Sequence, residues 1–439
     1  MTKSSRMSRI SQLLGGIIAF SLLGATGDTR SEEPAAWAKA HLGEIVELYR
    51  HFHAHPELSF MEQETAARLA KELRAIGAEV TEGVGGTGVV GVLKNGDGRT
   101  VLVRTDLDAL PVTEQTGLAY ASQVKVKAEA GETGVMHACG HDIHITNLIA
   151  VGRWLVAHKD QWKGTIIFLG QPAEERGSGA KKMLDDGLFT KFPKPDYCLA
   201  LHCDSELETG KVGVRGGYAL ANVDSVDITM LGKGGHGAYP HTTIDPIVMA
   251  AQLVLNLQTI VSREIKPIEP CVITVGSIHG GTKHNIIGND CHLQVTVRSY
   301  TDEVRQQLHD AIVRKAKAVS AGAGAPEPKV VFSEGTPAMF NDEKLAVRLR
   351  DVFVKQFGAA NVDDPEPSMG GEDFSQYGRA GVPILMFRLG TIEPARLARM
   401  KQLGQDPPSL HSPLYYPDAE PTLVTGVQAT VAATLELLK

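Results

Sequence analysis

Short apolar runs alternate with helix-length amphipathic segments along most of the chain. The apolar runs lie at residues 89–93, 101–104, 166–169, 197–201 and 384–389. Helical spacing of apolar residues marks 34–54, 62–76, 345–357 and 421–438. Most apolar runs have polar residues just beyond their C-terminal ends, which is where α/β proteins place their sites. The pattern therefore predicts an α/β sheet with helices on its faces.

The order of predicted strands and helices changes between residues 222 and 334. This stretch predicts a strand, a helix, two strands, a helix and a strand, at residues 223–231, 244–263, 272–278, 291–299, 302–319 and 329–332. The order β-α-β-β-α-β is that of a ferredoxin-like unit. We therefore predict a catalytic domain built from residues 28–221 and 335–439, interrupted by a lid or dimerisation domain at 222–334.

The first 27 residues differ in kind from the rest. Three basic residues, Lys3, Arg6 and Arg9, precede an apolar run at residues 10–24 and small residues at 25–27. This arrangement is typical of a cleavable signal peptide, so the sequence predicts a mature chain that begins near Asp28 and a secreted or periplasmic location. An uncleaved anchor is the alternative, although the run is short and contains glycine and serine. No other stretch predicts a membrane span.

Charge and composition exclude some partners. A net charge of −7 and 5% aromatic residues offer neither the basic surface nor the stacking platform of a nucleic-acid-binding protein. The length of 439 residues suits two domains. Export would place five cysteines in an oxidising compartment. If one of them binds a metal, four remain, and their pairing is left open: Cys198, Cys203, Cys271 and Cys291.

Residues 136–144, Met-His-Ala-Cys-Gly-His-Asp-Ile-His, gather one thiol, one carboxyl and three imidazoles. Cys139 and His141 flank a glycine, so both side chains can turn toward one point in a loop, and a helical pattern starts directly after them. Thiolate and neutral imidazole are ligands that zinc prefers. The alternative is a buried thiol among histidines that cap the helix. Acidic and imidazole groups further along the chain favour the metal site.

Four further stretches place acidic or imidazole groups at or near the ends of predicted strands or in loops: Asp106 and Asp108, Glu174 and Glu175, His202, and His411. Neighbouring carboxylates repel each other, so the adjacent pair Glu174-Glu175 is costly unless a cation lies beside it. In a metal site, one carboxylate can bind the metal while the other accepts a proton from water. The alternative is a solvated turn, but here the pair terminates an apolar strand.

Five motifs occur in the order seen in one known family: Arg-x-Asp-x-Asp-Ala-Leu-Pro at 104–111, Met-His-Ala-Cys-Gly-His-Asp at 136–142, Gln-Pro-Ala-Glu-Glu at 171–175, Gly-Lys-Gly-Gly-His-Gly-Ala-x-Pro-His at 232–241 and Ser-Met-Gly-Gly-Glu-Asp-Phe at 368–374. The chain resembles the M20 metallopeptidase and amidohydrolase family, in the branch of N-acyl-amino-acid, hippurate and auxin-conjugate hydrolases. The likeness runs from about Trp37 to the C-terminus. It implies a mixed-sheet, di-metal aminopeptidase-like catalytic domain with a ferredoxin-like lid. It also implies hydrolysis of the amide bond of N-acyl amino acids or short peptides.

The same resemblance assigns roles to individual residues. It implies two divalent metals, Zn, Mn, Co or Ni, with five protein ligands: Cys139, His141, Glu175, His202 and His411. Five ligands serve two metals only if one bridges, and Cys139 is the implied bridge. Glu174 would be the general base, and Asp106 would orient a ligating histidine.

Three residues of the predicted lid receive roles in the same way. His236, flanked by glycines that let the backbone approach a ligand closely, would polarise the scissile carbonyl. Asn285 and Arg298 would hold the substrate carboxylate. The lid would also provide the surface for a homodimer.

The sequence departs from the family pattern at three places. Gly371 stands where serine is expected, Cys203 stands where an apolar residue is expected, and residues 283–288 lack an expected proline. None of these changes removes a ligand. Other histidines have simpler interpretations: His53 and His55 end a helix and pack beneath the site, and His137 and His144 hydrogen-bond around it.

Three other interpretations stay open. An exported dipeptidase or carboxypeptidase of the same family would carry the same motifs. Cys139 as a nucleophile with His141 as its base would need a geometry that residues two apart rarely adopt, and the other predicted ligands would have no role. A non-catalytic metal- or peptide-binding protein would have no need for Glu174.

Overall fold

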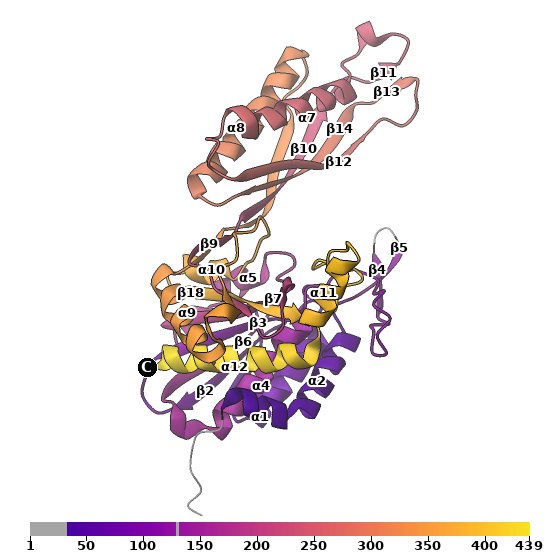
Figure 1. The fold of residues 1–439 in the computed structure, drawn as a ribbon. Helices are drawn as coiled ribbons and strands as arrows, with labels where there is room; N and C mark the ends of the chain where they lie inside the picture. Colours follow the sequence, from indigo (N-terminus) through magenta and orange to yellow (C-terminus); the bar gives the residue numbers. More distant parts are fainter. Residues whose placement is uncertain (1–32, 129–130) are drawn as a thin grey trace, which may run out of the picture. The chain divides into compact units, whose positions relative to one another are not determined.

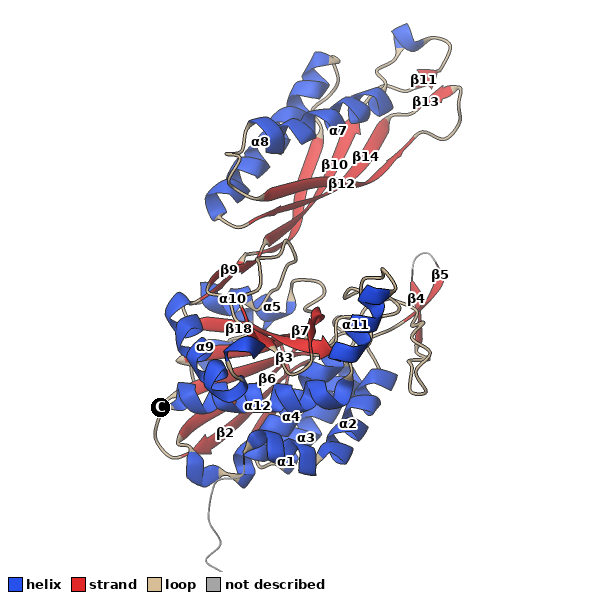
Figure 2. Cartoon of the chain, viewed as in Figure 1, coloured by secondary structure: helices blue, strands red, loops and turns tan. Residues whose placement is uncertain are grey.

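The computed structural model describes residues 33–128 and 131–439, which include a large mixed sheet with helices on both faces and a smaller sheet with helices on one face (Figures 1 and 2). The large sheet has eight strands in the order β1-β2-β6-β3-β7-β18-β8-β17. They are β1 (Glu79–Val84), β2 (Gly88–Asn95), β3 (Thr100–Asp106), β6 (Gly164–Gln171), β7 (Tyr197–Glu208), β8 (Val212–Gly213), β17 (Val362–Asp363) and β18 (Ile384–Ile392). The predicted α/β fold is confirmed.

The centre of the large sheet is parallel, and this brings the predicted site residues to one edge. Strands β3, β6, β7 and β18 run in the same direction, whereas β1 and β2 pair antiparallel at one side. Parallel strands direct their carboxyl ends to the same edge of a sheet. Asp106 pairs with Gln171 at the ends of β3 and β6, and Arg104 pairs with Ala200, two residues before His202.

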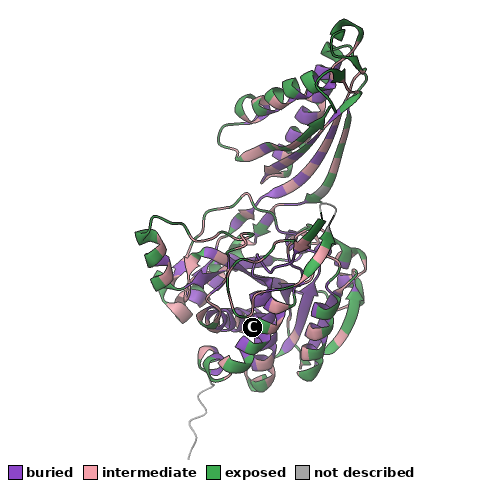
Figure 3. Cartoon of the chain, turned by 90° about the vertical axis from the view of Figure 1, so that its right-hand side faces the viewer, coloured by how far each residue is buried: buried purple, intermediate pink, exposed green. Residues whose placement is uncertain are grey.

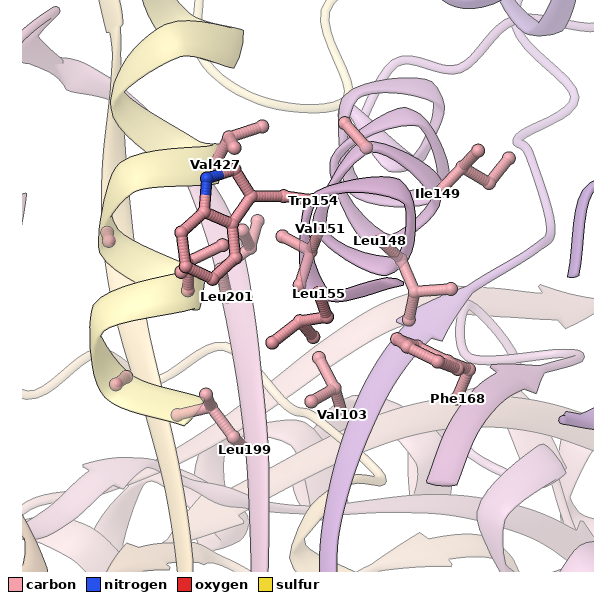
Figure 4. Close-up of a cluster of buried hydrophobic side chains, with 14 of the residues drawn as sticks. Val103, Leu148, Ile149, Val151, Trp154, Leu155, Phe168, Leu199, Leu201 and Val427 are labelled. Carbon is pink, nitrogen blue, oxygen red and sulfur yellow. The ribbon is translucent and has the colours of Figure 1, made fainter. Parts of the chain in front are cut away.

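Apolar side chains fill both faces of this sheet, as the period of two along a strand requires. One face is covered by α1 (Pro34–Ala40), α2 (Leu42–Ala54), α3 (Gln63–Ala75), α4 (His141–Ala157), α9 (Glu343–Phe357) and α12 (Ala419–Leu438). Figure 4 shows side chains of this cluster: Val103, Phe168, Leu199 and Leu201 from the sheet, with Leu148, Val151, Trp154, Leu155 and Val427 from α4 and α12. The opposite face packs against α5 (Gly179–Asp185), α6 (Leu188–Lys191) and α10 (Ser375–Arg379).

Residues 222–336 build the smaller sheet. Its strands are β10 (Asn222–Leu231), β12 (Cys271–Gly280), β14 (Asp290–Ser299) and β15 (Lys329–Thr336), all antiparallel, in the order β12-β14-β10-β15. Helices α7 (Pro246–Arg263) and α8 (Asp302–Gly322) cover one face and enclose a separate core (Figure 3). The side chains of Asp245 and Thr301 cap these helices. The predicted ferredoxin-like lid is confirmed, while the domain limits 28–221, 222–334 and 335–439 stay a prediction.

One predicted helix is wrong in extent. Residues 34–54 form α1 and α2, separated at His41, whose Nδ1 lies 2.9 Å from the carbonyl oxygen of Trp37. His41 has a φ of −103° and a ψ of 12°, which depart from helical values and separate the two helices. The apolar pattern also missed short elements: β4 (Lys125–Ala128), β5 (Gly131–Gly134), β9 (Gly217–Leu220), β11 (Gly235–His236), β13 (Ile286–Ile287), β16 (Met339–Asn341) and α11 (Pro394–Gln402).

The N-terminal predictions lie outside the described residues. Residues 1–27, which carry the predicted signal peptide, precede the first described residue, Glu33. Among residues 33–128 and 131–439, no helix is long and apolar enough to cross a membrane. All five cysteines lie in the described part, and all five are free thiols.

Candidate metal centre

The loop that carries Cys139 runs directly into helix α4, as predicted. Gly140 has a φ of +80° at the N-cap position, and His141 is the first helical residue. A Cβ at residue 140 would come 2.9 Å from the Sγ of Cys203, and a left-handed backbone is costly for residues that carry a Cβ. Glycine at residue 140 therefore allows the tight turn in which Cys139 and His141 are both buried at the edge of the sheet.

Hydrogen bonds fix the two histidines nearest to the thiol. The Nδ1 of His141 donates to the carbonyl of Asp108 over 2.8 Å, and the Nδ1 of His202 donates to the carbonyl of Cys203 over 2.7 Å. The Nε2 of each ring is then left with its lone pair, the form that binds a metal. The Nε2 of His202 lies 3.6 Å from the Sγ of Cys139, and the Nε2 of His141 is buried without a hydrogen-bond partner among the described residues.

Glu175 and His411 complete the cluster. One carboxylate oxygen of Glu175 lies 3.9 Å from the Nε2 of His141, and the other lies 3.5 Å from the Nε2 of His411. His411 has a φ of +69°, and its N–H donates to the carbonyl of Ala138 over 2.8 Å. A left-handed backbone is uncommon for a histidine, and such strain is concentrated at functional sites.

Two groups of ligand atoms share the thiol of Cys139. Cys139, His141 and His202 form one group, and Cys139, Glu175 and His411 form the other, with the atoms of each group within 4.8 Å of one another. A tetrahedral metal with bonds of about 2.0–2.3 Å separates its ligand atoms by about 3.3–3.8 Å. The Nε2 of His141 and the Oε1 of Glu175 are buried atoms that a metal would satisfy. The donor set therefore fits two divalent metals.

Asp108 has a larger part in the site than the sequence indicated. Its carboxylate accepts hydrogen bonds from the backbone N–H groups of Glu174 (3.2 Å) and Glu175 (3.1 Å) and from the hydroxyl of Ser59 (2.6 Å). Its carbonyl accepts from His141. Asp108 thus ties the end of β3 to the Glu174-Glu175 turn and to the start of α4. The Asp-x-Asp spacing identified this carboxylate, but not the backbone groups that it binds.

Asp106 makes its shortest contacts with residues other than the predicted ligands. Its Oδ1 accepts from the Nδ1 of His144 over 2.7 Å, and its Oδ2 accepts from Arg104 over 2.6 Å and lies 3.5 Å from the Nε2 of His141. Burial raises the pKa of Asp106, but the two histidines and Arg104 outweigh it and hold that pKa well below its usual range. The other nitrogen of His144 accepts from the N–H of Cys203 (2.9 Å), so both ring nitrogens of His144 are occupied.

Glu174 lies among buried acidic groups. Its carboxylate lies within 4.8 Å of those of Glu372 and Asp373, and Arg104 contacts Glu372 at 2.8 Å and Asp373 at 3.4 Å. Burial, followed by the charges of Glu372 and Glu175, raises the pKa of Glu174 well above its usual range. A carboxylate with a raised pKa suits a general base that must take up a proton and later return it.

The predicted substrate-binding residues fall into two groups. Arg298 lines a cavity of about 300 Å³ together with Cys139 and Glu174. His236, in β11, and Asn285 are exposed, and the N–H of Gly237 donates to the carbonyl of Asn285 over 2.8 Å beside the short pairing of β11 with β13. Neither of these two residues lines the cavity that contains the cluster.

The remaining histidines near the site are mostly buried. The Nδ1 of His53 lies 2.7 Å from Asp142 and its Nε2 lies 3.1 Å from Glu114. Burial lowers the pKa of His53, but the hydrogen bonds to these carboxylates outweigh it and raise the pKa to about 9. His53 therefore packs beneath the site as predicted, whereas His55 is exposed at the end of α2. His137 is buried, and burial lowers its pKa to about 4.

The sequence and the fold of this chain are similar to those of known proteins. The family model for Peptidase family M20/M25/M40 matches residues 102–400. This chain belongs to peptidase family M20. N-acetyl-L-cysteine deacetylase of Bacillus subtilis is 38% identical to it over 76% of this chain and 77% of its own length. Thermostable carboxypeptidase 1 of Saccharolobus solfataricus is 37% identical over 79% of this chain and 86% of its own.

A solved M20 structure shares the whole architecture. A dinuclear metal-binding M20 peptidase from Bacillus subtilis is 29% identical, has a TM-score of 0.74, and aligns with 91% of this chain and 99% of its own. The M20 resemblance, the catalytic domain with its lid and the enzymatic class are therefore confirmed. This M20 chain is a metal-dependent hydrolase of amide bonds in N-acyl amino acids or peptides.

One prediction is wrong. The predicted secreted or periplasmic location is contradicted by the comparison with the deacetylases to which this chain is similar. The prediction depended on residues 1–27 alone, which lie outside the described residues. An apolar run after basic residues is a pattern of composition, and this run is short and interrupted by glycine and serine.

Proposed function

We propose that Cys139 bridges two divalent metals, that His141 and His202 bind one of them, and that Glu175 and His411 bind the other. The observation that carries this proposal is the pair of ligand groups that share the thiol of Cys139. Thiolate and imidazole ligands favour zinc, while Mn, Co and Ni accept the same imidazole and carboxylate groups.

Glu174 is the general base in this proposal. When bound, the two metals supply polarisation of the amide carbonyl and activation of a water molecule. Glu174 accepts a proton from that water and returns it to the leaving amine. Asp108 holds the backbone N–H groups of Glu174 and Glu175 and so fixes the turn on which base and ligand stand next to each other. The buried side chains of Asp106 and His144 are hydrogen-bonded to each other beside the proposed metal ligands.

Arg298 is the proposed partner of the substrate carboxylate. Its Nε donates to the hydroxyl of Thr296 over 2.9 Å, and its Nη1 donates to the carbonyl of Met369 over 3.3 Å. The guanidinium is half-buried, and no ion pair with an acidic residue is found for it in the described part of the chain. Burial lowers the pKa of Arg298. A planar guanidinium without a carboxylate partner is well suited to bind one from a substrate.

His236 and Asn285 require a change of position, or a second copy of the chain, to act on the substrate. We propose that they reach it by a movement of the lid or from the partner in a lid-mediated homodimer. Two features support a homodimer: β12 is an edge strand of the lid sheet, and the neighbouring helix α7 exposes Val248 (53%) and Leu255 (72%).

A peptidase is the second candidate, because a carboxypeptidase is among the relatives. A purified sample should be stripped of metal and assayed with Zn, Mn, Co or Ni against N-acetyl amino acids and dipeptides. We expect metal-dependent release of free amino acid from at least one class, and no release by the Glu174→Gln variant. Hydrolysis of dipeptides alone would favour the peptidase. Tight binding of metal without hydrolysis of either class would indicate a non-catalytic binding protein.

A further inference from the structure

A buried carboxylate outside the metal cluster contacts the turn that carries the proposed base. Glu62 directly precedes helix α3, and its side chain is fully buried. Its Oε1 accepts a hydrogen bond from the backbone N–H of Ala173 over 2.8 Å, and its Oε2 accepts one from the hydroxyl of Thr87 over 2.5 Å. Ala173 is the residue directly before Glu174. The side chain of Glu62 therefore joins the hairpin between β1 and β2 to the turn that follows β6.

The carboxyl group of Glu62 is costly to bury. Within the described part of the chain, no positively charged side chain forms an ion pair with it. Burial raises the pKa of Glu62, and the charge of Asp108 adds to the rise, although the hydrogen bonds from Thr87 and Ala173 oppose it. An apolar side chain of similar size would avoid this cost. The carboxyl group at residue 62 is therefore best explained by the two groups that it holds.

Ala173 has a left-handed backbone, with a φ of +49°, and its side chain is buried. A residue with a Cβ rarely adopts this conformation, and such strain is concentrated at functional sites. Both backbone groups of the residue are held: the N–H by Glu62, and the carbonyl by the N–H groups of Ser178 and Gly179, each over 3.3 Å. Without the contact to Glu62, the backbone can relax toward a right-handed conformation. That relaxation would reorient the next residue, Glu174, whose side chain lines the cavity of the metal cluster.

We propose that Glu62 is a positioning residue for the hydrolysis: it keeps Ala173 in the left-handed conformation and so directs Glu174 into the cavity of the metal cluster. The inference rests on the proposed function. Glu62 binds the backbone N–H of the residue before the base, whereas Asp108 binds the two N–H groups that follow. Loss of the contact made by Glu62 should therefore impair the base while the metals stay bound.

The test replaces Glu62 with and without loss of its acceptor oxygen. Glu62→Gln keeps a carbonyl oxygen for the N–H of Ala173, whereas Glu62→Met fills a similar volume and leaves that N–H without a partner. Kinetics are measured with saturating metal on the N-acetyl amino acid or dipeptide for which wild type has the highest kcat/KM. Because a small misplacement of a reacting group lowers the rate, Glu62→Met should reduce kcat by about 10–100-fold with little change in KM, and Glu62→Gln should restore most of it. Glu64→Met, an exposed change on α3, is the control and should behave like wild type.

Three further measurements separate positioning from a general effect on stability. Elemental analysis should find the wild-type metal content in Glu62→Met. In the Glu174→Gln background, Glu62→Met should cause no further loss of activity, because a residue that acts through the base has no effect once the base is absent. Ala173→Gly should restore part of the kcat of Glu62→Met, since glycine adopts the left-handed conformation without a Cβ.

Several results would overturn the inference and leave the hydrolase intact. They are a wild-type kcat in Glu62→Met, an equal further loss in the Glu174→Gln background, a fall in kcat that follows a loss of metal, and no recovery from either Glu62→Gln or Ala173→Gly. If Glu62→Met does not fold, Thr87→Val decides, because it removes only the second contact of the carboxylate: a several-fold lower kcat supports the inference, and an unchanged kcat overturns it. Absence of metal-dependent hydrolysis by wild type would instead refute the proposed function, and the inference with it.

Discussion

The Nδ1 of His141 lies 2.8 Å from the carbonyl oxygen of Asp108, and the carboxylate of the same aspartate accepts the N–H groups of Glu174 and Glu175. One residue thus directs a predicted metal ligand and also the turn that carries another ligand and the base. The ligand atoms are held in place by contacts within the protein, so metal binding requires little rearrangement of the chain.

Metal removal should abolish hydrolysis and also destabilise the fold. Without metals, the buried carboxylates of Asp106 and Glu174 and the half-buried residue Glu175 lose the neighbouring positive charge that the metals supply. A ligand that binds only the native state stabilises it by about 4 kcal/mol at a free concentration of roughly 1,000 times its Kd. Chelated protein should therefore melt at a lower temperature, and Zn, Mn, Co or Ni should restore both properties. Unchanged activity in a sample shown to be metal-free by elemental analysis would contradict the di-metal site.

Cys139→Ser should lower the metal content more than any other single cysteine substitution. The thiol belongs to both ligand groups, so its loss should weaken the binding of both metals. Loss of a residue that merely supports a ligand typically costs roughly 10–100-fold in metal affinity, and loss of the bridge should cost more. Cys271→Ser, a half-buried thiol in the lid, is the matched control and should keep two metals per chain. Two metals bound to Cys139→Ser with normal affinity would exclude a bridging thiolate.

The proximity of the proposed ligands was predictable, because they follow apolar runs or lie in short motifs and parallel strands gather such positions at one edge. Their roles as ligands came from the resemblance to the family. The residues that orient the proposed ligands were harder to predict from the sequence. His141 donates to a backbone carbonyl, which every residue type provides, so no sequence pattern identifies Asp108 as its partner. The contact between Arg104 and Glu372 joins residues 268 apart, and it depends on the close packing of two segments rather than on either motif.

The lid shows where local pattern stops being informative. Its strands and helices follow from clear apolar periods, and the predicted order was correct. The distance of His236 from the metal cluster depends on the position of the lid. The spacing of apolar residues along the chain contains no information about that position.

His53 should stabilise the fold in a pH-dependent way. Its pKa is raised from 6.5 to about 9, so the stabilisation is fully present below pH 6.5 and is lost as the pH rises through about 9. The change in the pKa of His53 from 6.5 to about 9 corresponds to roughly 3 kcal/mol for this buried group. Urea unfolding of metal-free His53→Gln should show that deficit at pH 6.5 and a smaller one at pH 10. His55→Gln, at an exposed site, should unfold like wild type at both pH values. A deficit for His53→Gln that does not change with pH would mean that His53 is not charged in the native state.

His236→Ala should lower kcat by about 10²–10³, the usual cost of removing one donor to a developing oxyanion, while the metal content stays at the wild-type value. Both ligand groups lie outside the lid, so the substitution cannot act through them. Mixing His236→Ala with Glu174→Gln, two chains of strongly reduced activity, tests which copy supplies the histidine. Recovered activity would require that His236 of one copy serves the site of another. If the kcat of His236→Ala were within a few-fold of the wild-type value, His236 would have no role in catalysis and would serve only in the local turn.

The adjacent carboxylates of Glu174 and Glu175 should respond differently to the same substitution. Glu174→Gln keeps the size of the side chain but cannot accept a proton, so hydrolysis should fall by roughly 10²–10⁴ or more while both metals stay bound. Glu175→Gln removes a carboxylate whose oxygens lie 3.9 Å from His141 and 3.5 Å from His411, so one metal should be depleted and excess metal should partly restore activity. Glu206→Gln, an exposed change on β7, is the control for both.

Metal stoichiometry measured beside kcat separates the two roles. A Glu174→Gln protein that loses metal, together with a Glu175→Gln protein that keeps it, would reverse the assignment of base and ligand. Full activity and full metal content in both variants would remove Glu174 as the base and Glu175 as a ligand at once. Because Asp108 binds the backbone N–H groups of both residues, neither substitution should disturb the turn itself. A loss of activity can therefore be read as a loss of the carboxylate rather than of the fold around it.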